Sequence, residues 1–252
     1  ENALLEVLPS AAADAPAYNG LKEMVVVHTG LELGATIYLD YSVVTRPGYL
    51  PELDVCEQVE ELSPIREYVF SLSVPESKPL HYEWLNGKAA PVVKTAGGMK
   101  TVTWILKNVQ PRPYSLDVSL PAGNVQAVVA STYASKADAL KVIKQQLESN
   151  GKDVTELAQK LTAGAQTTEQ KKELLTAYVE GLGNCRLTLS QTGYLLRPAS
   201  EVIRSAYGTE AEKAALLAAL QQAIGIRAEI KAAFPKTEDK DAVSNSFFCS
   251  VV

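Results

Sequence analysis

The first half of the chain alternates apolar and polar residues with the period of two that is typical of β-strands. Together with short apolar runs, this alternation predicts strands at residues 24–27, 35–44, 65–74, 81–85, 92–95, 101–106 and 116–120. In the run 35–44, Ile37, Leu39 and Tyr41 fall on one face together with Val43. Asn86-Gly87 and Ala96-Gly97-Gly98 read as tight turns between strands. Because strands and turns recur here without a helical period, the sequence predicts an antiparallel β-sandwich.

Beyond about residue 135 the apolar residues follow a helical period instead. Helix-start signals stand at Ser135, Asp153, Thr167, Pro198 and Thr209. The helix that begins after Thr209 is expected to end close to Gly225, with Leu216, Leu217 and Leu220 buried against a sheet. Residues 226–232 alternate again, and together with 247–252 they predict two late strands.

These patterns predict an α+β fold with two domains. We expect a β-sandwich domain at residues 1–131 and a domain of helices and strands at residues 132–252. The chain of 252 residues is long enough to give each of them a hydrophobic core.

Composition narrows the function classes. Hydrophobic residues make up 46% and charged residues 21% of the chain, which is ordinary for a globular protein. A net charge of −5, without a basic stripe, argues against a nucleic-acid partner. No apolar run approaches the roughly 20 residues that a membrane helix needs. The residue pattern calls for no cofactor and no metal.

The chain has three cysteines, Cys56, Cys185 and Cys249, which lie far apart and lack the spacing of a zinc site or a disulfide framework. We interpret them as buried thiols. The two histidines, His28 and His81, both fall in the β-rich half. Recruiting either into a cysteine–histidine pair would require a site shared between the two domains.

The segment from Arg197 to Ala228 is the most informative stretch of the chain. It contains Gly208, then Glu212-Lys213-Ala214, a leucine-rich turn, and Gly225-Ile226-Arg227-Ala228. This segment resembles the part of bacterial transglutaminase-like (papain-fold) proteins that carries the catalytic cysteine at a helix start. The first half resembles the β-sandwich domain of unknown function that often precedes such cores. The resemblance implies a transglutaminase-like second domain.

The resemblance places the cysteine position at Glu210 and the histidine position at Cys249. The acid that orients the histidine would lie beyond Val252, so this domain is expected to be incomplete at its C-terminus. A thiol at a helix start is activated by the unpaired N–H groups and the helix dipole, whereas a carboxylate there cannot form a thioester. Thr209 and Glu212 also match the pattern of a capping box. Glu210 is then an acidic residue in the first turn of a helix, which is common and needs no catalytic role.

We therefore expect no catalytic residues and a catalytically degenerate protein that acts as an extracytoplasmic binding or structural module. The suspected location, periplasmic or secreted, and a peptide, protein or carbohydrate partner follow from the resemblance alone. The alternative is a cysteine peptidase or transglutaminase-like hydrolase with rearranged residues, using Cys249 or Cys185. Two further alternatives are a hydrolytic role for Glu210 with Glu201, and a binding face made of exposed aromatic rings.

Those aromatic candidates are Tyr82, Trp84 and Trp104, which stand on the predicted strands. Aromatic rings at alternate strand positions belong to the core more often than to a binding surface. Two or more rings coplanar on one solvent face would favour the binding interpretation.

Overall fold

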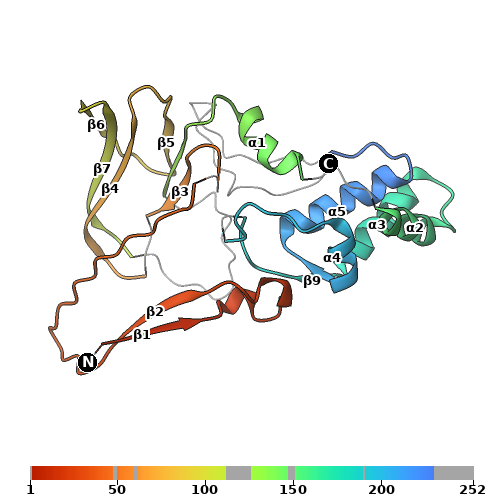
Figure 1. Ribbon diagram of the computed structural model, residues 1–252, viewed down its shortest axis with the longest axis horizontal. Helices are drawn as coiled ribbons and strands as arrows, with labels where there is room; N and C mark the ends of the chain where they lie inside the picture. The colour runs from red at the N-terminus through yellow and green to blue at the C-terminus, as the bar shows by residue number, and fades with distance from the viewer. Residues whose placement is uncertain are drawn as a thin grey trace. The chain divides into compact units, whose positions relative to one another are not determined.

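The computed structural model describes residues 2–47, 50–59, 62–111, 126–146, 151–189 and 191–229. Within these residues it contains ten strands and five α-helices, and most strand pairs are antiparallel (Figure 1). The α+β fold class predicted from the sequence is thereby confirmed.

The described residues group into two units. The sandwich unit holds 50–59, 62–111 and 126–145, and the helical unit holds 2–47, 146, 151–189 and 191–229. The helical unit therefore takes in the N-terminal segment of the chain. The domain boundary that we predict near residue 131 stays a prediction, because grouping by contacts does not by itself define a folding domain.

The sandwich unit contains two three-stranded antiparallel sheets. One has the order β3–β8–β5, made of Asp54–Gln58, Ala127–Ser131 and His81–Leu85. The other has the order β4–β7–β6, made of Ile65–Pro75, Met99–Val109 and Val92–Ala96. Helix α1, Lys136–Lys144, follows the sheets and begins after Ser135, whose Oγ accepts from the N–H of Asp138.

The two sheets share one apolar core. Buried side chains from β4, β7 and β8 meet there, namely Leu72, Val74, Val102, Trp104, Val128 and Ala130, together with Leu80. On β4 and β7 the inward residues alternate with outward hydroxyls, and the Oγ atoms of Ser71 and Thr103 lie 2.8 Å apart. This alternation is the period of two that predicted the strands.

The turn between β6 and β7 explains a pair of glycines. Ala96 pairs with Met99, so Gly97 and Gly98 form a two-residue turn, with φ values of 58° and 75°. Both values lie in the left-handed region, which glycine adopts without steric cost. The predicted hairpin is confirmed.

The helical unit contains α2 (Lys152–Thr162), α3 (Thr168–Glu180), α4 (Ala199–Ser205) and α5 (Glu210–Ala223). Its N-terminal part forms the antiparallel hairpin of β1 (Asn2–Val7) and β2 (Glu23–His28). Two short parallel strands, β9 (Gly183–Asn184) and β10 (Tyr207–Gly208), bring the chain to the start of α5.

The core of the helical unit lies between its helices. Leu216 and Leu220 of α5 are fully buried and pack with Val154 of α2, Leu175 of α3 and Val202 of α4. The predicted burial is confirmed for Leu216 and Leu220, whereas Leu217 is only partly buried. Among the described residues these leucines pack against helices and not, as predicted, against a sheet. Helices that are close in sequence cover this face of α5.

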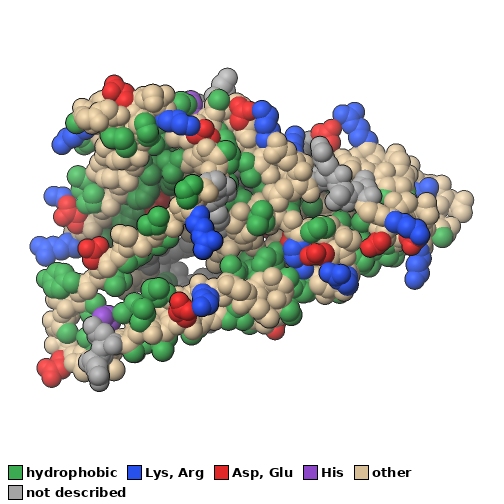
Figure 2. Space-filling model, in the orientation of Figure 1, with side chains coloured by type: hydrophobic (Ala, Val, Ile, Leu, Met, Phe, Trp, Pro, Cys, Tyr) green, Lys and Arg blue, Asp and Glu red, His purple; other side chains and the backbone are tan. Residues whose placement is uncertain are grey.

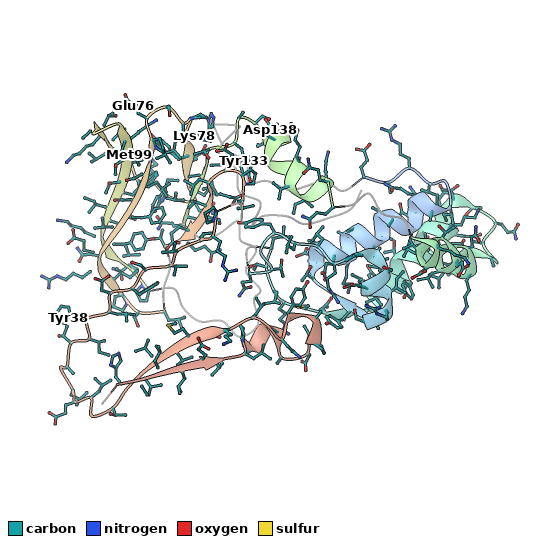
Figure 3. All side chains as sticks on the ribbon, in the orientation of Figure 1. Tyr38, Glu76, Lys78, Met99, Tyr133 and Asp138 are labelled. Atoms are coloured by element: carbon teal, nitrogen blue, oxygen red, sulfur yellow. The ribbon has the colours of Figure 1, made fainter. Side chains whose placement is uncertain are left out.

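Two predicted strands are absent from the described residues. Residues 35–44 are not in a strand, and most of their large apolar side chains are exposed, Tyr38 among them at 90% (Figure 3). Residues 226–229 are likewise outside any strand. Alternation is a local property, whereas a strand also needs a partner that local sequence does not specify. The predicted strands at 116–120 and 247–252 lie outside the described residues.

Candidate functional site

The start of α5 carries the capping box that the sequence predicted. Thr209 precedes the helix with extended backbone, and α5 begins at Glu210. The N–H of Glu212 donates to Thr209 Oγ1 at 3.2 Å, and the N–H of Thr209 donates to Glu212 Oε2 at 2.9 Å. Two of the amides that a helix start leaves unpaired are thereby satisfied.

Gly208 lets the chain approach this helix closely. A Cβ atom on Gly208 would lie 3.2 Å from Val202 Cγ1 and 3.3 Å from Lys213 Cγ. Both distances are tighter than ordinary van der Waals contact, so a larger residue would require these side chains to shift by a few tenths of an ångström. The glycine of the motif is therefore explained here by packing.

Glu212 is the polar centre of the site and is only 1% exposed. Its carboxylate forms a bidentate ion pair with Arg197, in which Nε donates to Oε1 and Nη2 donates to Oε2, both at 2.9 Å. Oε1 also accepts from the N–H of Arg197 at 3.0 Å and from the hydroxyl of Tyr18 at 2.6 Å. With the bond from Thr209, five donors surround this one carboxylate.

Arg197 is held as firmly as its partner. Its Nη1 donates to Ser205 Oγ at 3.0 Å, and Nη2 also donates to the carbonyl oxygen of Tyr207 at 2.8 Å. The guanidinium carbon lies 4.5 Å from the ring centroid of Tyr207 and 5.4 Å from that of Tyr18, within the range of cation–π attraction. The pair is thus fixed on every side by side chains from distant parts of the sequence.

The electrostatics of the cluster fix its protonation state. Burial raises the pKa of Glu212, but hydrogen bonds from Arg197, Tyr18 and backbone amides outweigh it and leave that pKa below its ordinary value. Burial and the bond to Glu212 raise the pKa of Tyr18. Burial lowers the pKa of Arg197, yet Glu212 outweighs this effect and raises it. A carboxylate held in this way is a poor general base near neutral pH.

Sequence reasoning missed this cluster, although one signal was present. It treated Glu212 only as a capping residue and assigned neither Arg197 nor Tyr18 a role in the site. Glu212 lies four residues before Leu216 and eight before Leu220, so the helical period already placed it on the buried stripe of α5. A charged residue on such a stripe needs a partner.

Glu210, the predicted nucleophile position, stands apart from the cluster. It is exposed in the first turn of α5, where acidic side chains interact favourably with the helix dipole. Glu201, considered as its hydrolytic partner, lies in the first turn of α4 and reaches toward Arg204 at 3.9 Å. Each carboxylate is accounted for by ordinary helix chemistry, and within the described part of the chain no contact joins the two.

The structure brings Cys185 next to the start of α5. Its N–H donates to the carbonyl oxygen of Gly208 at 2.9 Å, and it follows β9, which pairs with β10. Its side chain is buried with Ala12, Ala15 and Leu187. Sequence reasoning named Cys185 only as a residue that could lie near the site, and the parallel pairing is what places its backbone there.

The other cysteine and histidine candidates do not join this cluster. Cys56 lies on β3 in the sandwich unit, and burial raises the pKa of its thiol to about 12, with smaller contributions from Asp54 and Glu57. His28 lies on β2 and His81 on β5. Cys249, the predicted histidine position, lies outside the described residues.

The aromatic candidates of the sandwich form part of its core. Trp104 is buried, and Tyr82 and Trp84 are half-buried and pack against it. The Tyr82 and Trp104 rings meet edge to face at 85°, with centroids 5.4 Å apart, and Trp84 is tilted by 36° from Trp104. These three rings therefore pack in the core, as favoured from the sequence, and do not form the coplanar solvent face that would support the binding interpretation.

In the part of the chain that the structure describes, no group of three or more His, Cys, Asp or Glu side chains could hold a metal ion. None of the helices there is both long and apolar enough to cross a bilayer.

Comparison with known proteins gives a family match for the first part of the chain. Residues 1–113 match the family described as "Domain of Unknown Function with solved-structure structure", DUF3857. No curated protein matches the chain.

One solved structure resembles nearly the whole chain. It is the crystal structure of a protein from Parabacteroides distasonis ATCC 8503 that is described as a "putative protease". The two chains are 41% identical with a TM-score of 0.87, and the match covers 99% of this chain. It covers 50% of the Parabacteroides chain, so the present chain spans half the length of that relative.

Proposed function

We propose that this chain is a catalytically degenerate, transglutaminase-like protein that acts as a binding or structural module. The observation that carries the proposal is the start of α5. By the resemblance, the nucleophile position there is Glu210, an exposed carboxylate beside a capping box. Acyl-transfer and cysteine-peptidase chemistry need a thiolate, a base and an orienting group. A carboxylate at the nucleophile position cannot form the thioester with which this chemistry begins.

The buried cluster behind α5 supports the same proposal. Glu212 and Arg197 satisfy each other, so this pair keeps the helix start in place and has no proton to exchange near neutral pH. The chain has two histidines, on β2 and β5, and the motif offers neither of them as a base.

The test is an activity assay on the purified chain and on a restored variant. The unmodified chain should show no burst of thioester formation with activated acyl or amide substrates. The double variant Glu210→Cys with Cys249→His should recover at most trace activity unless a carboxylate also orients the new imidazole, because a wrongly oriented imidazole loses orders of magnitude in rate. Glu201→Cys, which places a thiol in the first turn of α4, is the matched control for a thiol at a helix start.

Iodoacetamide-sensitive turnover by the unmodified chain would overturn this proposal. It would support the alternative, a cysteine hydrolase with rearranged residues. The observation that favours this alternative is the position of Cys185 beside Gly208, and the relative described as a protease agrees with it. In that case Cys185→Ala should abolish turnover, whereas Cys56→Ala in the sandwich unit should leave it unchanged.

A periplasmic or secreted location belongs to the same proposal and rests on the resemblance alone. Fractionation of cells that produce the protein from its own gene tests it directly. Recovery in the cytoplasmic fraction would contradict it. A peptide, protein or carbohydrate remains the class of partner that we expect.

A further inference from the structure

A chain of 3₁₀ turns runs from Pro9 to Leu21, and we refer to it as the strap. Successive backbone N–H groups donate three residues back, from Ala12 to Pro9, Ala13 to Ser10, Ala15 to Ala12, Tyr18 to Ala15, Asn19 to Pro16 and Leu21 to Tyr18, at 2.8 to 3.2 Å. A 3₁₀ helix has three residues per turn, so residues three apart stack on one face. The strap contains two such helices, Ser10–Ala12 and Pro16–Tyr18, and its inward residues are spaced three apart, namely Ala12, Ala15, Tyr18 and Leu21.

The face of the strap packs on a defined part of the helical unit. Ala12 and Ala15 are buried at 0% and 2% exposure and contact Cys185 and Leu187. The partly buried rings of Tyr18 and Tyr207 complete this cluster, together with Leu21. The two alanines have no bulk beyond Cβ, so the strap backbone lies close to the surface that receives it.

The polar contacts of the strap are directed to the start of α5. The hydroxyl of Tyr18 donates to Glu212 Oε1 at 2.6 Å, and the N–H of Ala17 donates to Tyr207 Oη at 2.7 Å. The Tyr18 ring lies under the guanidinium of Arg197. These contacts span 190 or more residues of sequence, so they are tertiary recognition and not local structure.

The segments on either side of the strap are exposed. On the β1–β2 hairpin Leu4 and Met24 are more than 60% exposed, and Figure 2 shows hydrophobic side chains at the surface along this hairpin. Residues 35–44 follow β2 and are exposed as well. Burial in the N-terminal segment is thus concentrated in the strap.

We propose that the helical unit carries a peptide-binding surface and that the strap occupies it in cis. The receiving surface consists of Cys185, Leu187, Arg197, Tyr207 and Glu212. It recognises a short peptide with small residues at positions i and i+3 and a tyrosine at i+6, whose hydroxyl donates to the buried carboxylate. The occupied surface covers the capped start of α5. This goes beyond the proposed function, because the surface exists whether or not that helix start is catalytic.

The experiment cuts the connection and asks whether the strap behaves as a ligand. A site for a specific protease is inserted between Leu39 and Asp40 in the exposed segment of the full chain. After cleavage, the N-terminal fragment should stay bound on size exclusion and should be displaced by an excess of a synthetic peptide of residues 9–21. The same peptide with Tyr18→Phe should compete about 10- to 100-fold less well, since it lacks a hydrogen bond to a charged group.

The full-length Tyr18→Phe variant, cleaved at the same site, should release its fragment more readily. Tyr38→Phe is the matched control, because Tyr38 is exposed on the same fragment, and it should behave like the unmodified chain. Far-UV circular dichroism of the cleaved protein reports whether the helices persist. Unfolding on cleavage would overturn the proposal, because the strap would then be part of the core and not a ligand. Equal competition by the two peptides, or failure of both to displace the fragment, would overturn it as well.

Discussion

The two units bury their polar groups in different ways. The core of the sandwich unit is apolar, and its hydroxyl pairs, such as Ser71 with Thr103, face outward. The helical unit places a carboxylate in its interior and surrounds it with five donors. Buried hydroxyls also occur in the sandwich unit, at Ser131, Thr132 and Tyr133, and that of Tyr133 has no hydrogen-bond partner among the described residues.

This difference concerns what each unit requires to remain folded. An apolar core tolerates changes that conserve volume, because its contacts are non-directional. A buried ion pair depends on geometry and charge, and removal of one partner leaves the other charge in a medium that cannot solvate it. The helical unit should therefore be the more sensitive of the two to single polar substitutions and to acid.

The largest expected effect is that of Arg197→Met. The substitution keeps an apolar stem of similar length but leaves Glu212 buried without its cation, which should lower the free energy of unfolding by about 3–5 kcal/mol. Urea denaturation followed by far-UV circular dichroism measures it. Arg204→Met is the matched control, because that side chain is exposed, and it should change the free energy by less than about 0.5 kcal/mol.

Tryptophan fluorescence, recorded during the same urea denaturation of Arg197→Met, tests whether the two units differ in their sensitivity to this substitution. Both tryptophans, Trp84 and Trp104, lie in the sandwich unit, so their signal reports that unit alone. If the tryptophan transition moves as far as the helical transition in Arg197→Met, the two units unfold together. The helical unit would then not be more sensitive to polar substitution than the sandwich unit.

Acid should affect the helical unit through Glu212. The pKa of this carboxyl is lower in the folded protein than its ordinary value of 4.5, so the unfolded chain binds the proton more tightly. The resulting stability is present above pH 4.5 and is lost as the pH falls below it toward the folded-state pKa. Glu212→Gln should flatten the acid dependence of the helical transition. An unchanged dependence would assign it to other carboxylates of the helical unit and contradict this role of Glu212.

A smaller effect separates the two capping boxes of the helical unit. Thr209 with Glu212 is buried, whereas Thr167 with Gln170 at the start of α3 is exposed. Thr209→Ala should cost about 1–2 kcal/mol, and Thr167→Ala about 0.5–1 kcal/mol, since water can replace the lost bond only at the exposed site. Thermal unfolding of the two variants side by side provides the measurement. Equal losses would contradict this argument from burial.

The smallest expected change is that of Tyr133→Phe. The hydroxyl of Tyr133 is buried beside α1 without a partner among the described residues, and burial raises its pKa to about 12, with help from Asp54 and Glu52 (Figure 3). Removing it should leave stability unchanged or raise it by up to about 1 kcal/mol. Chemical denaturation followed by tryptophan fluorescence tests this in the sandwich unit. A clear loss would mean that the hydroxyl is hydrogen-bonded in solution.

Turns and helix caps could be predicted from the sequence, because residues close together in the chain determine them. The Gly97-Gly98 hairpin and the Thr209 capping box are both complete within four to six residues, and both are confirmed. The run 35–44 shows the limit of this reasoning. Its alternation is as regular as that of β4, but no local feature supplies a neighbouring strand, and the described residues do not form one.

The site was readable only in part for the same reason. Thr209 and Glu212 are three residues apart, and the helical period indicated that Glu212 is buried. Arg197 reaches Glu212 across α4, and Tyr18 reaches it from 194 residues away. No pattern within a window of sequence joins these residues, because the fold alone brings them together.

The contact between Tyr18 and Glu212 also bears on the order of events during synthesis. All described residues of the sandwich unit lie between 50 and 145, so they leave the ribosome before α5 exists. The strap emerges before the sandwich unit, yet it has to wait for residues 185–212 before its partners are available. Contacts of such long sequence separation form slowly, because a large loop must close first. During translation the apolar residues of the strap are therefore a natural site for a chaperone to bind.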